Sequence, residues 1–95
     1  VEQNYPNPFN PETRIQYRIP EAAFVQLTIF NLKGQQVRML EASQKSRGTY
    51  SVIWDGKDNI GRQVSSGVYL YRLSVEPLSE NGTRFEESRK LLLIR

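Results

Sequence analysis

The sequence predicts an all-β protein, either an antiparallel β-sandwich or a small barrel. Segments in which apolar and polar residues alternate recur along the 95 residues, and turn-forming residues separate them. A period of two places every second side chain on the same face of a strand. No window of adequate length shows the 3.6-residue period of an amphipathic helix. We therefore expect about five or six short strands whose inward faces make one core.

The alternating segments locate these strands. They lie at residues 13–19, 25–30, 37–39, 50–54, 67–75 and 84–94. In the third segment, Val37 and Met39 share one face and Arg38 takes the other. An alternative prediction for residues 38–46 is a single helical turn, because residues 40–42 are good helix formers.

Glycines mark two of the expected turns. Gly34, in "NLKGQ" at 31–35, can adopt positive φ without a steric penalty. The "NG" at 81–82 is a strong hairpin signal and precedes the last strand.

Most aromatic side chains fall on the same parity as Ile, Val and Leu. We therefore expect Tyr17, Trp54, Tyr69 and Tyr71 to pack in the core, because aromatic side chains supply large buried areas in small proteins. Phe24 and Phe30 fall on the opposite parity and are expected to mark an interaction surface.

The composition argues against catalysis. The chain has no Cys and no His, so thiol nucleophiles, imidazole bases and the usual zinc ligands are absent from it. Glu86 and Glu87 are adjacent and would face opposite sides of a strand, which does not suit paired acid and base chemistry. We expect no enzyme activity and no cofactor.

Charge and hydropathy limit the partners. The net charge is +3, and the basic residues are scattered rather than gathered in a stripe, so no nucleic-acid partner is expected. The longest apolar candidate for a membrane span is the stretch at residues 91–94. It is far shorter than the roughly 20 residues that a membrane helix needs.

The loop "DGKDNIGRQ" at 55–63 admits two interpretations. Asp55, Asp58 and Asn59 could offer oxygen ligands to calcium, but their spacing does not match the EF-hand loop. The favoured interpretation is a turn in which these side chains bond nearby backbone amides while Gly56 and Gly61 take unusual dihedral angles.

The first eleven residues form a Pro/Asn-rich lead-in. Pro6, Pro8 and Pro11 cannot donate backbone hydrogen bonds, so the segment cannot be a central strand. It suits an edge strand or stiff entrance that Tyr5 and Phe9 anchor to the core. We expect one domain over 1–95, with lead-in 1–11 and sandwich body 12–95, cut from a larger precursor because the chain does not begin with Met.

Three segments together resemble a known family: "YPNPFNPETRIQYRIP" at 5–20, "SVIWDGKDNIGRQVSSGVYLYRL" at 51–73 and "RKLLLIR" at 89–95. They are similar to the C-terminal sorting domain of the type IX (Por) secretion system, and equally to the related immunoglobulin-like module of the flagellar hook-capping protein. The resemblance implies an immunoglobulin-like antiparallel sandwich of about seven strands.

For the sorting family, the resemblance implies a non-catalytic sorting signal. It would direct an N-terminal cargo domain through the periplasm and outer membrane of a Gram-negative bacterium to the cell surface or medium. The partners would be the outer-membrane translocon and sortase-like components, which read either the folded surface or a released terminal strand. By position, the recognition motifs fall on Pro6, Asn7, Pro8, Gly67, Val68, Tyr69, Lys90, Leu91, Leu92, Leu93, Ile94 and Arg95.

Two alternatives stand beside the sorting signal. One is a structural spacer or assembly module of the hook-capping type, which shares the fold. The other is a carbohydrate-binding accessory module of a secreted hydrolase, which would use exposed Phe24, Phe30 or Tyr50 to stack on sugars.

Overall fold

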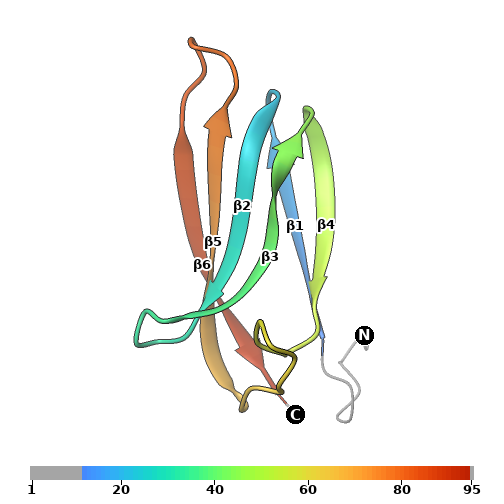
Figure 1. Ribbon diagram of the computed structural model, residues 1–95, viewed down its shortest axis with the longest axis vertical. Coiled ribbons are helices and arrows are strands. Elements are labelled where there is room, and N and C mark those ends of the chain that lie inside the picture. Colours follow the sequence, from blue (N-terminus) through green and yellow to red (C-terminus); the bar gives the residue numbers. More distant parts are fainter. Residues whose placement is uncertain (1–11, 95) are drawn as a thin grey trace.

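The computed structural model describes residues 12–94. They form six strands: β1 (Thr13–Ile19), β2 (Ala23–Phe30), β3 (Gln36–Lys45), β4 (Gly48–Trp54), β5 (Gly67–Pro77) and β6 (Phe85–Leu93). All pairings are antiparallel; β1 pairs with β4, and the other sheet has the order β3-β2-β5-β6 (Figure 1). The predicted all-β sandwich is confirmed, with six strands in this part of the chain.

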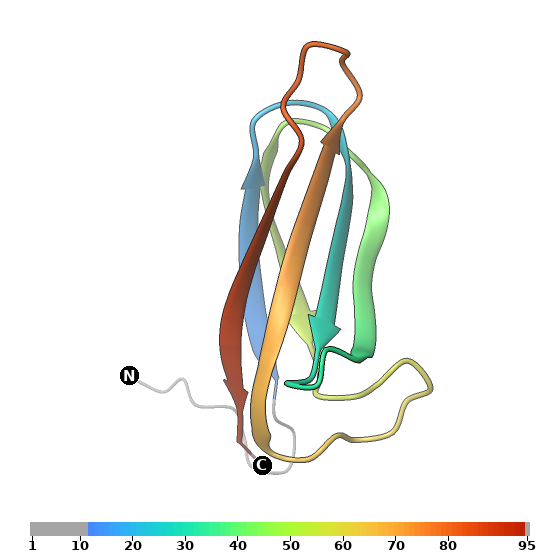
Figure 2. The same cartoon turned by 90° about the vertical axis from the view of Figure 1, so that its left-hand side faces the viewer.

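The two sheets lie face to face, and the core fills the space between them (Figure 2). Alternation within each strand supplies the inward side chains, as the sequence predicts. The buried apolar residues are Ile15, Tyr17, Ile19, Ala23, Val25, Leu27, Ile29, Trp54, Tyr69, Leu73, Val75 and Leu93. Tyr71 is half-buried and packs against this cluster, so all four aromatic residues predicted for the core contribute to it.

The simple alternation of inward and outward side chains fails in strand β3. Its pairing with β2 shifts register twice: Leu40 is passed over between the pairs Leu27–Glu41 and Thr28–Met39, and Val37 is passed over between Ile29–Arg38 and Phe30–Gln36. Each shift is a β-bulge, which inserts one extra residue and reverses the sides of the residues beyond it. Leu40 therefore packs against the core, whereas Met39 is 36% exposed. The prediction that Val37 and Met39 share one face is wrong, because Val37 packs against the core whereas Met39 is exposed.

The strand reading of residues 37–39 is confirmed and extended, and the helical alternative for 38–46 is wrong. Residues 41–45 pair with residues 23–27 of β2. Backbone pairing along this length outweighs the weak helix preference of residues 40–42.

The predicted hairpin at 81–82 exists, but the reason that it needs glycine at position 82 is steric. Residues 78–84 form a loop between β5 and β6, closed by the Gly82 amide, which donates to the Ser79 carbonyl at 3.2 Å. A Cβ at Gly82 would lie 2.8 Å from both Pro77 Cγ and Glu21 Oε2. The loop needs glycine for this close approach. The lead-in 1–11, with Tyr5 and Phe9, lies outside the described residues.

Aromatic pairs connect the strands within and between the sheets. Tyr17 and Tyr50 stack with ring centroids 5.5 Å apart, and Trp54 meets Tyr69 edge-on at 5.2 Å. Burial, and next the charge of Glu41, raises the pKa of Tyr17 to about 12. The neutral phenol is therefore the form that the folded protein favours.

The bulge predicts unequal effects of two neighbouring substitutions. We expect Leu40→Ala to lower the free energy of unfolding by about 2 kcal/mol, because it removes a side chain packed on the core. Met39→Ala should cost less than about 1 kcal/mol because its side chain is largely outside the core. Urea unfolding of both variants measures this. A larger loss for Met39→Ala would contradict the assigned register.

Tyr17 predicts a loss of stability at high pH. The folded protein keeps the Tyr17 proton up to a pKa of about 12, whereas the unfolded chain loses it near 10.0. The free energy of unfolding should therefore fall as pH rises through this window, by about 2 kcal/mol for this group. Unfolding of Tyr17→Phe should show a correspondingly smaller fall between pH 9 and 12. Equal slopes for the two proteins would contradict the assignment.

Candidate functional site

The outer face of the four-stranded sheet carries an apolar surface, here called the outer-face patch: Phe30, Val68, Leu70 and Leu92. Leu70 lies opposite Phe30 on β2, and Val68 lies opposite Leu92 on β6. Their strand neighbours Ile29, Tyr69 and Leu93 are buried in the core, so alternation turns the patch away from it.

Exposure within the patch follows from strand lengths. The β2–β5 ladder ends at the pair of Phe30 and Leu70, so Val68 keeps a neighbour only on β6. Val68 is 38% exposed and Leu92 is 59% exposed. At the other end, the guanidinium of Arg72 lies 4.7 Å from the centre of the Phe30 ring, a cation–π contact that places positive charge beside the patch.

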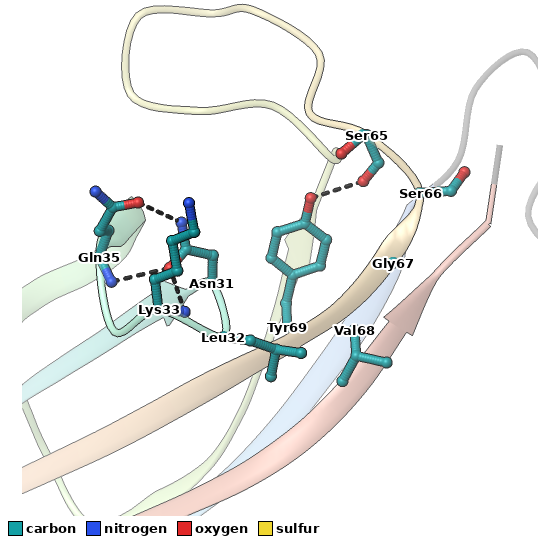
Figure 3. A pocket seen from close by; sticks show the side chains of 9 residues that line it. All are labelled: Asn31, Leu32, Lys33, Gln35, Ser65, Ser66, Gly67, Val68 and Tyr69. Carbon is teal, nitrogen blue, oxygen red and sulfur yellow. Dashed lines mark hydrogen bonds between the residues drawn. The ribbon is translucent and has the colours of Figure 1, made fainter.

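An open pocket of about 340 Å³ continues the patch at the end of the sandwich (Figure 3). Its walls are the 31–35 turn, with exposed Leu32, and residues 65–69, including Val68. The turn is fixed because the Asn31 side-chain oxygen accepts from the Lys33 and Gln35 amides at 2.9 and 3.0 Å, and Gly34 adopts a φ of 83°. The pocket has a polar rim and suits an apolar side chain.

The opposite wall of the pocket is tied to the core. The Tyr69 hydroxyl donates to the Ser65 carbonyl at 2.6 Å, and the Tyr69 ring contacts Trp54. Hydrogen bonds therefore hold both walls of the pocket.

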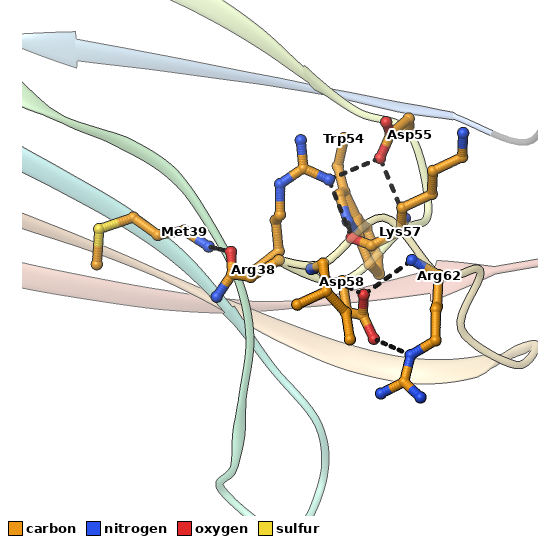
Figure 4. Close-up of polar contacts among 9 residues, drawn as sticks. Arg38, Met39, Trp54, Asp55, Lys57, Asp58 and Arg62 are labelled. Atoms are coloured by element: carbon orange, nitrogen blue, oxygen red, sulfur yellow. Dashed lines mark hydrogen bonds and ion pairs between the residues drawn. The ribbon is translucent and has the colours of Figure 1, made fainter.

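The 55–63 loop is a hydrogen-bonded turn, as predicted (Figure 4). Asp58 Oδ1 accepts from the Arg62 and Ile60 amides at 2.9 and 3.1 Å, and Asp55 Oδ1 accepts from the Lys57 amide at 3.1 Å. The bond from the Arg62 amide is the main cause that lowers the pKa of Asp58. Gly56 and Gly61 adopt φ of 75° and 89°. Within residues 12–94, no group of three or more metal-ligating side chains is assembled.

The same loop covers one end of edge strand β3. Asn59 donates its amide to the Val37 carbonyl at 3.1 Å and accepts the Met39 amide on Oδ1 at 3.0 Å. Arg38 Nη1 adds bonds to Asp55 Oδ1 at 2.9 Å and to the Lys57 carbonyl at 3.1 Å. Asn59 thus satisfies β3 backbone groups that another strand could otherwise use.

The structure brings two of the three predicted recognition motifs together. Gly67, Val68 and Tyr69 lie opposite Leu93, Leu92 and Leu91 in the β5–β6 ladder, and Lys90 lies opposite Leu70. Tyr69 and Leu93 are core residues, and Ile94 is exposed beyond the strand end. Pro6, Asn7, Pro8 and Arg95 lie outside the described residues.

The residues of the carbohydrate alternative do not form one stacking platform. Phe24 and Phe30 lie on the outer face of the four-stranded sheet, whereas Tyr50 lies on β4 and stacks on buried Tyr17. The sequence did identify Phe30 as a surface residue. It missed Leu32 and Leu70, although Leu70 has the same opposite parity to the core that singled out Phe30.

The FlgD Ig-like domain family matches residues 8–79. The chain belongs to this family. A solved structure, the crystal structure of FLGD from P. aeruginosa, is 23% identical, with a TM-score of 0.65; the match covers 86% of this chain and 61% of that one. This likeness shows the immunoglobulin-like fold. No curated protein matches the chain.

These matches correct the expected role. Both point to the hook-capping relative, so the interpretation as a type IX sorting signal is wrong. The expected translocon and sortase-like partners are wrong with it, as is the route through the periplasm and outer membrane to the surface or medium. At the level of the family, the FlgD Ig-like domain is structural rather than catalytic.

Among the described residues, no helix is long and apolar enough to cross a membrane.

The Asn59 contact predicts a local change. We expect Asn59→Ala to speed hydrogen exchange of the Met39 amide and to lower the free energy of unfolding by about 1 kcal/mol, because that amide loses its acceptor. Neighbouring Ile60 is 73% exposed, so Ile60→Ala is the matched control and should change neither quantity. An unchanged Met39 exchange rate in Asn59→Ala would show that the loop does not cover β3.

Proposed function

We propose that this chain is a non-catalytic structural module of an assembly protein of the flagellar hook-capping type, and that its outer-face patch contacts a neighbouring protein in that assembly. The observation that carries the proposal is the family match over residues 8–79. The chain spans 61% of the length of the FLGD chain it resembles, so the partner and the assembly itself are part of the proposal.

The geometry supports a contact surface rather than a reaction site. One face of the four-stranded sheet is committed to the core, and the other exposes Val68 and Leu92 beside a pocket with Leu32 on its rim. Arg72 is already held over Phe30, and aromatic and Arg side chains are enriched at protein interfaces. We assign Val68 and Leu92, which are exposed and lie opposite each other in the paired motifs, to the contact.

We also propose that the module is one domain, with residues 12–95 as its body. The six strands share one core, and both sheets contribute to it. Residues 1–11 would then join this body to whatever precedes it in the whole protein.

The test uses the whole protein in the bacterium that makes it. The double variant Val68→Asp with Leu92→Asp places two carboxylates in the patch, where burying them without partners is costly. We expect loss of completed hooks by electron microscopy and loss of swimming in soft agar, with normal protein abundance on an immunoblot.

Ile53→Asp is the matched control, because Ile53 is 45% exposed on β4, in the other sheet. It should leave hooks and swimming unchanged. Normal hooks after deletion of the whole module would overturn the assembly role. Normal hooks in the double variant, together with loss after deletion, would overturn only the assignment of the patch.

A further inference from the structure

Strand β6 is an edge of the four-stranded sheet. Within residues 12–94 it pairs with β5 alone, so its other side presents unpaired backbone groups along Phe85–Leu93 (Figure 1). An exposed strand edge of this length is a template for pairing with another strand. The opposite edge, β3, is partly covered by Asn59, whereas no described residue covers β6 in this way.

The charges of β6 are arranged symmetrically about Ser88. The sequence of its middle is Glu86, Glu87, Ser88, Arg89 and Lys90, with acidic residues before Ser88 and basic residues after it. In an antiparallel pair of identical strands centred on Ser88, every acidic residue faces a basic one.

We propose that β6 pairs antiparallel with β6 of a second copy of this chain, around a two-fold axis at Ser88. Glu87 then lies opposite Arg89 of the second copy, and Glu86 lies opposite its Lys90. Phe85, which is half-buried, lies opposite the half-buried Leu91 of the second copy. Directly opposite side chains are near enough to interact, and opposite charges stabilise such pairs.

The four charged side chains of β6 are available to pair with a second copy. Glu87 and Arg89 form an ion pair of 2.9 Å along the strand, with side chains 49% and 63% exposed. Glu86 and Lys90 are exposed and form no ion pair with another described residue. The dimer would give both of them a partner.

The face of the sheet on which the charged residues of β6 lie explains how their charge selects a partner strand. Glu87 and Arg89 lie opposite Leu73 and Tyr71 of β5, on the side of the sheet that faces the core, yet both are exposed. Charged residues on that side of an edge strand disfavour pairing with unrelated apolar strands. A second copy of β6 supplies the complementary charge, so the same residues permit self-pairing.

The resulting interface is closed. Two four-stranded sheets would join through β6 into one continuous sheet of order β3-β2-β5-β6-β6-β5-β2-β3. A two-fold contact uses the same strand of both copies and leaves no β6 edge free for further growth. The axis is perpendicular to the sheet, so both outer-face patches lie on the same side. This dimer does not depend on the proposed function.

Sedimentation velocity of the chain over a range of concentrations and salt tests the proposal with charge variants. The basic variant, Glu86→Lys with Glu87→Arg, and the acidic variant, Arg89→Glu with Lys90→Glu, each place like charges opposite one another. Compared with the wild-type dimer, we expect each alone to dimerise at least about tenfold more weakly. An equimolar mixture should restore the dimer, and so should the full swap of all four residues.

Glu80→Lys is the control, because it changes the charge of an exposed loop residue away from β6. It should dimerise like the wild type. Circular dichroism of each variant checks that the sandwich is folded. Failure of both the mixture and the full swap to dimerise would overturn the proposal even if the single-sign variants are monomeric.

A second readout uses the absence of cysteine from the chain. Ser88→Cys would place two thiols directly opposite one another, at a separation that a disulfide can span. We expect oxidation to yield a covalent dimer from Ser88→Cys and not from Glu80→Cys. A wild-type chain that stays monomeric at millimolar concentration, while a chain lacking residues 1–11 dimerises, would overturn the proposal and assign the β6 edge to that segment.

Discussion

The pairing of β2 with β5 decides which side chains form the core and which form the surface. Val25 lies opposite Val75 and Leu27 opposite Leu73, and all four are buried. The same register brings Phe30 opposite Leu70 on the other face. Because side chains alternate with a period of two, a slip of one residue would exchange the two faces. The energy of burying the core therefore also holds the outer-face patch in place.

Much of the sandwich could be predicted from the sequence because its strands keep that alternation. Tyr17, Trp54 and Tyr69 fall on the core parity and are buried, and Phe24 and Phe30 fall on the other. The prediction failed at Met39 because a bulge depends on the partner strand, whose register a single strand does not reveal. The pocket was missed for a similar reason, since its walls are far apart in the chain and meet only through sheet pairing.

Several residues of the segments that suggested a sorting domain build the fold. Tyr69 packs against Trp54, and Leu93 is buried opposite Gly67. Trp54 also donates its ring N–H to the Lys57 carbonyl at 2.9 Å, which ties the 55–63 loop to the core. Such constraints belong to the sandwich itself, and a fold does not specify a function. They identify the fold well and separate its functions poorly.

Function is better sought in side chains that the sandwich does not need. The sandwich needs glycine at position 82 because a Cβ there would approach Pro77 too closely. It needs Asn59 because its side chain bonds to the edge of β3. Leu92 and the charged middle of β6 are exposed and contribute little to the core. A sheet that closes the end of one edge with its own loop while leaving nine residues open on the other is asymmetric in its capacity to bind. Within the four-stranded sheet of residues 12–94, β6 therefore offers a second strand a longer uncovered edge than β3 does.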